Sequence, residues 1–203
     1  MGERLLVATS DPVTFATDLI GWYAVQVNAN DVACAGATPR WFLATLLVPE
    51  SSSLDGAEAL FGQLLEACES AGVTLIGGHS EVTYGLDRPI IVGSMLGEVE
   101  RDKLVHPGGA LEGDSIVLTK GIAIEGTAIL ARERAGALGQ AAVPIETIEK
   151  AAALLVNPGI SVVKDARIAC AAARVHSLHD VTEGGLATGL REVAQASGLG
   201  LAV

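Results

Sequence analysis

Four polar, glycine-associated segments interrupt an unusually apolar chain, and they carry the residue types that hold a metal–phosphate group. Each lies at or near the end of a hydrophobic run. The segments are Ser10-Asp11-Pro12, Asn30-Asp31, residues 77–81 (GGHSE) and residues 179–185 (HDVTEGG). Carboxylates supply the oxygen ligands that Mg²⁺ prefers, and glycine lets the backbone approach a phosphate closely. Acids that are distant in sequence but similarly placed therefore predict one metal–phosphate site that folding assembles.

Asp31 is the acid that is hardest to explain as a surface residue. Helical spacing places Val27, Asp31 and Cys34 on one stripe of an otherwise apolar helix, so Asp31 is expected to face the protein. A buried carboxylate without a partner costs on the order of several kcal/mol, so it needs a cation or hydrogen-bond donors. The residues alone leave both roles open. Asp11, at the end of the first predicted strand, could reach the same metal or form an Asx-turn before Pro12.

The two glycine-rich segments add backbone and imidazole groups. Gly77 and Gly78 follow a predicted strand, and a turn there could present N–H groups to a phosphate or simply reverse the chain. His79 is a weak candidate for a phosphate donor or general acid. Asp180 precedes a predicted helix with Thr182 as its expected N-cap, which fits either an anion site or ordinary capping. The chain contains neither a P-loop nor a G-x-G-x-x-G motif after a strand.

Alternating strand and helix patterns must position these groups, and a break rich in turn residues over 101–114 predicts two domains, 1–105 and 106–203. The expected strands cover residues 4–9, 41–48, 73–76, 89–99, 115–119 and 175–178. The expected helices cover residues 18–35, with Asp18 as N-cap, and 53–71, 125–134, 146–155, 161–173 and 183–196. The apolar run 200–203 looks like a strand just begun, so the second domain is expected to be incomplete. The short lead before the first strand suggests truncation at that end as well.

Composition supports a cytoplasmic α/β protein and excludes several classes. Half of the 203 residues are apolar, only 3% are aromatic, and 24 are glycine. The net charge of −11 argues against nucleic-acid binding but allows a nucleotide whose charge a cation offsets. The three cysteines form no C-x-x-C pair and are expected to be small buried hydrophobes in a reducing compartment. No signal peptide or membrane-spanning run is visible.

Taken in order, the polar segments resemble the aminoimidazole-ribonucleotide synthetase-like (PurM-like) superfamily. This superfamily includes thiamine-monophosphate kinase, selenophosphate synthetase and the E-type hydrogenase maturation factors. The matching stretches are Ser10-Asp11 and residues 27–40 (VNANDVACAGATPR), 77–82 (GGHSEV) and 179–187 (HDVTEGGLA). The resemblance implies a PurM-like N-terminal domain, whose strands form a barrel at a homodimer interface, followed by a C-terminal α/β domain.

The same resemblance implies ATP and Mg²⁺ as cofactors, bound in a cleft between the two domains. Asp11 and Asp31 would hold Mg²⁺, Asp180 would join them, and Gly77 and Gly78 would line the nucleotide. Asn30 and His79 complete the expected nucleotide-binding set, with Asn30 supporting Asp31. The glycine and proline pattern over 36–39 and 184–188 is closest to the maturation factors, which dehydrate a carbamoylated cysteine and work with a maturation partner protein. The alternatives are a small-molecule kinase or synthetase, or a dimerisation module without activity.

Overall fold

The computed structural model describes residues 2–15 and 18–203, and its described part contains one four-stranded sheet. The strands are β1 (Arg4–Val13), β2 (Thr38–Pro49), β3 (Thr74–Thr83) and β4 (Ile90–Glu100). Their order across the sheet is β1-β4-β2-β3; β4 runs antiparallel to both neighbours, and β2 runs parallel to β3. The expected mixed α/β class is confirmed.

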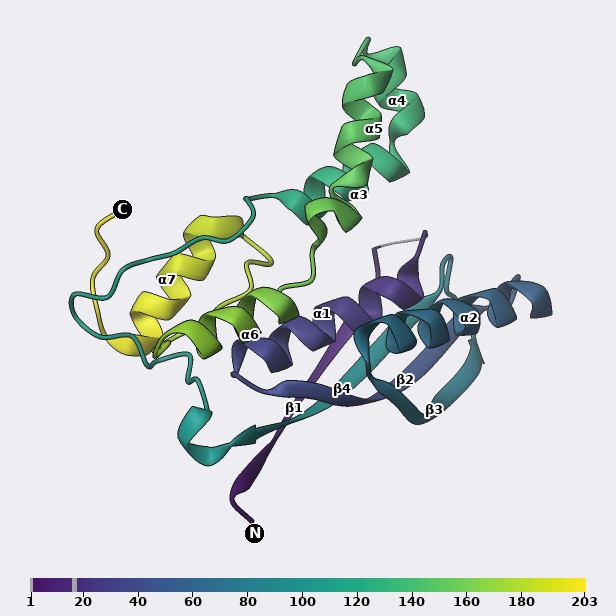
Figure 1. Ribbon diagram of the computed structural model, residues 1–203. Coiled ribbons are helices and arrows are strands. Elements are labelled where there is room, and N and C mark those ends of the chain that lie inside the picture. The colour runs from purple at the N-terminus through teal and green to yellow at the C-terminus, as the bar shows by residue number, and fades with distance from the viewer. Residues whose placement is uncertain (1, 16–17) are drawn as a thin grey trace.

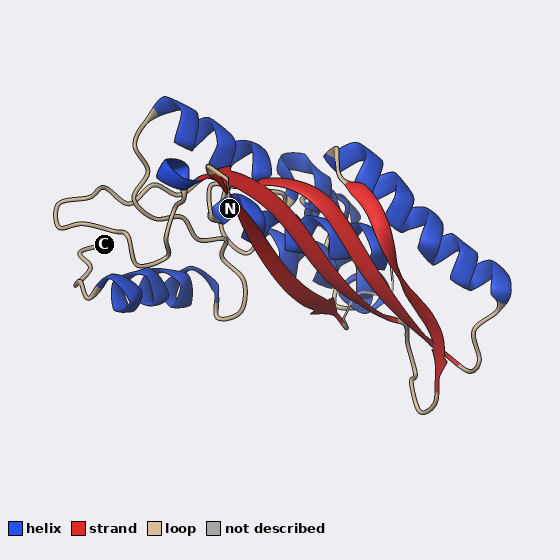
Figure 2. Ribbon diagram, turned by 90° about the horizontal axis from the view of Figure 1, so that it is seen from below, coloured by secondary structure: helices blue, strands red, loops and turns tan. Residues whose placement is uncertain are grey.

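All the long helices of the first half pack on one face of this sheet (Figures 1 and 2). They are α1 (Ile20–Cys34) and α2 (Leu54–Ala71); the short turn η1 (Arg101–Lys103) follows β4. The second half is helical: α3 (Ile124–Glu133), α4 (Ala135–Gln140), α5 (Ile145–Ala153), the π-helical segment η2 (Leu155–Gly159), α6 (Val163–Ala172) and α7 (Gly185–Ser197). In Figure 1, α3, α4 and α5 project away from the sheet, whereas α6 runs alongside α1. No helix in the described ranges is both long and apolar enough to cross a membrane.

Helix α1 is the scaffold of the molecule because it is buried on more than one side. Its sequence is apolar nearly all the way round, which is typical of a helix enclosed by other elements. Ile20, Val25 and Val32 are fully buried between the sheet and the later helices. The same core cluster includes Leu155 and Ile160 of the second half. Polar residues on α1 are therefore held rigidly inside the protein.

Capping residues explain one helix boundary and not another. Ser53 accepts a hydrogen bond from the Gly56 N–H and starts α2, and Gly72 ends this helix in the left-handed region, as predicted. Asp18 does not cap α1: its carboxylate accepts from Arg132 of α3, and the helix begins after Leu19 without a side-chain cap. That prediction was wrong because a distant cation outcompetes the local backbone for Asp18.

Two strands run straight through polar segments that were predicted to be strand ends or turns. Asp11 lies inside β1, opposite Gly93 of β4, and residues 77–81 lie inside β3. The pairing of β2 with β3 shifts by one residue between Phe42 and Leu43, so β3 contains a bulge next to Gly77 and Gly78. Gly78 has φ +156°, and a Cβ there would lie 1.9 Å from the Ala44 carbonyl oxygen. These glycines serve a bulged strand rather than a turn.

Three short apolar runs predicted as strands are irregular in the structure. Residues 115–119, 175–178 and 200–203 have no ladder partner among the described residues. Val117 is 81% exposed, which a buried strand would not allow. A strand forms only when a neighbouring strand supplies backbone hydrogen bonds. A local apolar pattern does not show whether such a neighbour is present.

The cysteines divide between core and surface. Cys68 is buried in the core and Cys34 is partly buried, in line with the expectation of small hydrophobes. Cys170 is exposed on α6, so the expectation was wrong for this residue.

Candidate metal and nucleotide site

Three acids from distant parts of the chain interact at the C-terminal half of α1. Asp11 comes from β1, Asp31 from α1, and Asp180 from the loop before α7. The pKa of Asp31 rises from its ordinary 3.8 to about 7, first because of burial and then because of hydrogen bonding with the Asp11 side chain; the charge of Asp180 adds to the effect. A buried carboxyl that stays protonated up to about pH 7 beside another carboxyl shows that no cation among the described residues neutralises the negative charge at that position.

Neighbouring polar groups fix the first two acids in place. Thr9 donates its hydroxyl hydrogen to Asp31 Oδ2 over 2.7 Å, which partly opposes the rise in the Asp31 pKa. Asn28 is fully buried and accepts from the Asp11 N–H over 3.0 Å, while its amide donates to the Ala24 carbonyl over 2.8 Å. Asn28 therefore ties β1 to α1 at the level of Asp11.

The close approach of Asn28 to the sheet depends on a glycine. A Cβ at Gly93 would lie 2.4 Å from Asn28 Nδ2 and 2.7 Å from the Phe42 ring, closer than real Cβ contacts. Gly93 pairs directly with Asp11 in the ladder between β1 and β4. The Asn28 amide therefore packs against the sheet at the level of Asp11 and Gly93.

The Asp180 loop is anchored on both sides. Cys34, one helical turn after Asp31, has a raised pKa because it is buried and because Asp180 lies against it, both as a charge and through a hydrogen bond. The His179 ring lies 2.7 Å from Glu192 of α7 and 2.7 Å from the Asp180 carbonyl oxygen. The predicted stripe of Asp31 and Cys34 does face the protein. Thr182 is not the N-cap, because α7 starts after Gly184, two residues further along the chain.

Further acids extend the negative charge beyond the predicted set. Glu125, in the first turn of α3, has a raised pKa because of burial and then because of the charges of Glu183 and Asp180. Among residues 2–15 and 18–203, no group of three or more carboxyl, histidine or cysteine side chains is arranged to hold a metal ion without other ligands. Mg²⁺ usually takes one or two carboxylates and completes its shell with phosphate and water, so the donor chemistry fits this ion.

Asn30 has a different role from its neighbour Asp31. Its amide nitrogen donates to the Ile160 carbonyl over 3.0 Å, and its oxygen accepts from the Val162 N–H over 2.7 Å. Asn30 is 6% exposed, and both of these hydrogen bonds join its buried amide to the backbone between η2 and α6. Its expected part in nucleotide binding stays a prediction.

The glycine–histidine segment lies at the opposite edge of the sheet from the acids. Asp11, Gly93, Ala44 and Gly78 occupy one row across the four strands, and three strand spacings of about 4.8 Å separate Asp11 from Gly78 by about 14 Å. His79 is 70% exposed, and its Nε2 lies 4.0 Å from Glu81. The fold of this chain does not bring Gly77, Gly78 and His79 to the acids, and their role stays a prediction.

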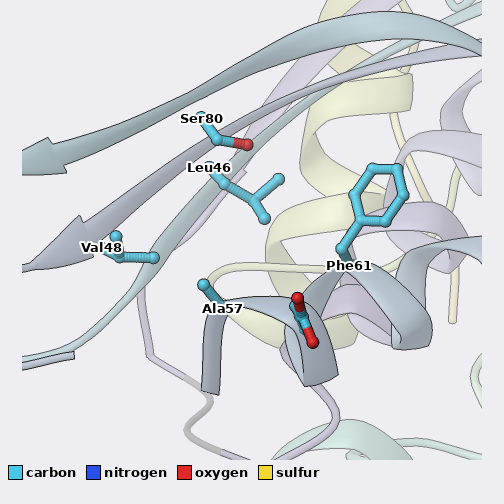
Figure 3. A pocket seen from close by; sticks show the side chains of 6 residues that line it. Leu46, Val48, Ala57, Phe61 and Ser80 are labelled. Carbon is cyan, nitrogen blue, oxygen red and sulfur yellow. The ribbon is translucent and has the colours of Figure 1, made fainter. Parts of the chain in front are cut away.

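The inner face of the same strand borders a small apolar hollow (Figure 3). The hollow measures about 260 Å³ and lies between α2 and strands β2 and β3. Leu46, Val48, Ala57, Phe61 and Ser80 point into it. This lining has no cationic group, so the hollow does not suit a phosphate.

Sequence reasoning found the three acids but missed the groups that hold them. Asn28 lies three residues before Asp31, and Thr9 lies two residues before Asp11, so each shares a face of its helix or strand with one acid while it bonds to the other acid. That spacing was the available signal for both. Glu125 gave no comparable signal, because the acids that raise its pKa are remote in sequence. The pairing of His179 with Glu192 joins residues on a loop and a helix, so no single periodicity marks it.

Comparison with known proteins adds an independent observation. Two family models match this chain: AIR synthase related protein, N-terminal domain, over residues 2–99, and AIR synthase related protein, C-terminal domain, over residues 112–203.

The most similar relatives considered are hydrogenase maturation proteins. The chain is 30% identical to a hydrogenase expression/formation protein of Methanocaldococcus jannaschii, over 100% of this chain and 58% of that protein. It is 31% identical to the carbamoyl dehydratase HypE of Cupriavidus necator, over 98% of this chain and 55% of that protein. A solved structure of the hydrogenase maturation protein HypE in complex with ATP superposes with a TM-score of 0.70 and 24% identity, over 95% of this chain and 56% of that one. The chain therefore spans somewhat more than half the length of these proteins.

Proposed function

This chain belongs to the AIR synthase related family, and from that premise we propose that it binds ATP with Mg²⁺ in an enzyme that activates an acceptor oxygen by phosphoryl transfer. The observation that carries the proposal is the convergence of Asp11, Asp31 and Asp180 from β1, α1 and the loop before α7; the raised pKa of Asp31 supports it. A cluster of carboxyls that must retain a proton is relieved when a cation binds. The ATP complex of the similar HypE structure supports the choice of nucleotide.

The residues of this chain would divide the work of binding. Asp11 and Asp31 would hold the cation, with Asp180 joining from the loop before α7. Thr9 and Asn28 orient the first two acids, and His179 holds the loop of the third. When bound, Mg²⁺ would neutralise phosphate charge, which together with positioning provides most of the catalysis in phosphoryl transfer.

For the acceptor, the hydrogenase maturation reaction is the preferred candidate. The two relatives named above are a hydrogenase expression/formation protein and a carbamoyl dehydratase, and both align over nearly the whole chain. The acceptor would then be a carbamoylated cysteine presented by a protein tail, with a maturation partner protein as its source. A small phosphorylated metabolite as acceptor would instead indicate the kinase or synthetase branch.

Isothermal titration calorimetry of the chain with ATP tests the nucleotide proposal. We expect saturable binding in the presence of Mg²⁺ and binding at least about tenfold weaker with EDTA, because the acids repel an uncompensated triphosphate. Absence of binding under both conditions would contradict the proposal and favour a module without activity. ATP consumption is then measured with carbamoylated cysteine peptides and, separately, with small phosphate esters. The compound that increases ATP consumption is the acceptor.

We also propose a homodimer formed through the open face of the sheet. Figure 2 shows this face of the sheet without a covering helix. Several residues on it are apolar. Leu6 is 64% exposed and Leu43 is 37% exposed, and Leu47, Val92 and Leu96 are half-buried beside them. A face of this kind on an antiparallel sheet is ordinarily polar when it meets water. A second copy of the chain would cover it.

Sedimentation velocity checks the dimer. The chain is expected to sediment as a dimer, and Leu6→Lys is expected to shift it towards monomer, because an amine would be buried in an apolar interface. Leu54→Lys is the matched control, since Leu54 is 74% exposed at the start of α2 on the helical side. A wild-type monomer at all concentrations, or an equal effect of both substitutions, would contradict the proposed interface.

A further inference from the structure

A second hollow lies on the other side of α1 from the acids. It measures about 420 Å³ and is bounded by α1, the end of α2, η2 and the start of α6. Gln26 lines it from α1, five residues before Asp31. Five residues at about 100° each place the two side chains about 140° apart around the helix, so the hollow is separate from the acid cluster.

The Gln26 side chain is a polar group at this hollow that has no hydrogen-bond partner among the residues that the structure describes. The residue is only 6% exposed, yet no group in the described parts of the chain forms a hydrogen bond with its side chain. An amide carries two donors and an acceptor, and those of Gln26 are not used by the described residues. Because Gln26 borders the hollow, these groups are available to a molecule that enters it.

Two cations stand at the same hollow. Lys164 and Arg167 lie three residues apart on α6, so they share one face of that helix. No carboxylate in the described ranges forms an ion pair with either, although the chain has a net charge of −11. Other lysines are paired: Lys120 with Asp165, for example, and Lys150 with Glu146. An unpaired pair of cations in an acidic protein favours an anionic ligand.

The remaining wall is apolar and well fixed. Trp22, Leu155 and Val163 provide flat and aliphatic surface beside the polar groups. Lys120 donates to the Gly159 carbonyl over 3.2 Å and also to the Ser161 carbonyl. The Asn30 side chain holds the neighbouring residues Ile160 and Val162. The backbone that forms this wall is therefore anchored before any ligand arrives, which lowers the entropy cost of binding.

We propose that this hollow is a second ligand site, which takes a small organic anion. Its apolar body would lie against Trp22, its anionic head would meet Lys164 and Arg167, and the Gln26 amide would hydrogen-bond to it. Sites of a few hundred Å³ with apolar walls and a few convergent polar groups are typical of small-molecule binding. The inference rests on this hollow alone and is independent of the ATP proposal.

Phenyl phosphate is a suitable probe, and Trp22 is a built-in reporter. The chain has two tryptophans, so Trp41→Phe leaves Trp22 as the only one. Saturable quenching of Trp22 fluorescence by phenyl phosphate is expected, with phenol and inorganic phosphate each binding about tenfold more weakly or worse. Calorimetry on the unmodified chain gives the same comparison without relying on the Trp41 substitution.

Substitutions distinguish this site from the acid cluster. Lys164→Gln and Arg167→Gln are each expected to weaken phenyl phosphate binding about tenfold, the value of a charge-assisted contact, and Gln26→Leu about fivefold. Lys150→Gln is the matched control, because this exposed lysine on α5 lies outside the hollow, and it should leave affinity unchanged. Unsaturable quenching, equal loss in the control, or loss of binding in Asp31→Asn would overturn the proposal.

Discussion

Replacing Asp31 with asparagine is expected to lower Mg²⁺-dependent ATP binding and turnover by about a hundredfold or more while the chain stays folded. The amide keeps the shape and the Thr9 contact of Asp31 but removes the charge that a hard cation requires. Removal of one charged contact at a phosphate site typically costs about 3 kcal/mol or more, which corresponds to this factor. Calorimetry with Mg²⁺ and ATP and a steady-state hydrolysis assay measure it. The result depends on the proposed function.

The matched control is Asp87→Asn, in the loop between β3 and β4. Asp87 is 85% exposed, and among the described residues its one ion-pair partner is its sequence neighbour Arg88. It should bind and hydrolyse ATP as the wild type does. Undiminished turnover in Asp31→Asn, with the control equally active, would show that Asp31 does not hold the metal.

The same substitution is expected to stabilise the metal-free chain at alkaline pH. The folded-state pKa of Asp31 is raised from 3.8 to about 7, so the folded chain binds the proton more tightly than the unfolded chain does. Stability from this group is therefore complete below about pH 4 and is lost as pH rises through about 7. Asparagine avoids that loss. After discounting for solvent screening of a partly exposed group, the gain is about 1–2 kcal/mol at pH 8.

Urea unfolding in EDTA at pH 8 and pH 4.5 measures this effect. The gain from Asp31→Asn should be present at pH 8 and much smaller at pH 4.5. If Asp31→Asn changed the free energy of unfolding equally at both pH values, Asp31 and Asp11 would not compete for a proton. The electrostatic basis of the proposed metal site would then fail.

The acids could be predicted from sequence because burial makes an unpaired charge conspicuous. Asp31 stands out in an apolar helix together with Cys34 one turn later, and in the structure both residues interact with Asp180. Asn28 was missed although it lies on the same helix, because a buried amide is less unusual than a buried acid. The hydrogen-bond partner of Asn28 is the Asp11 N–H, and no sequence pattern shows which backbone N–H will bond to a side chain.

Strand ends were misplaced for a reason that the sheet topology explains. Pro12 and the Gly77-Gly78 pair predict strand ends, since both residue types disfavour regular ladders. Both lie on edge strands, β1 and β3, where proline needs no inner partner and a glycine bulge is tolerated. Which strand lies at an edge is a non-local property, so the sequence alone could not show it. The three false strands in the second half failed on the same point, because pairing was absent.

Asn30→Leu is expected to reduce the free energy of unfolding by about 2–4 kcal/mol, the second largest effect predicted for this chain. Leucine has a similar size but cannot bond to the Ile160 carbonyl or the Val162 N–H, which lie 3.0 and 2.7 Å from the asparagine amide. Each buried backbone group left unsatisfied costs about 1–3 kcal/mol. Urea unfolding measures the loss, with Gln140→Leu on exposed α4 as a control of little effect.

Hydrogen exchange separates local from global loss at this position. The Val162 amide should exchange much faster in Asn30→Leu, because Asn30 is its hydrogen-bond acceptor, whereas amides of β4 should lose protection only as far as global stability falls. Unchanged exchange at Val162 would show that α1 and the segment before α6 are held by apolar packing alone. Accelerated exchange together with intact Mg²⁺-dependent ATP affinity would identify Asn30 as a structural link. Loss of that affinity in the folded variant would restore its predicted part in binding the nucleotide, since Asp31 is the next residue of the same helix.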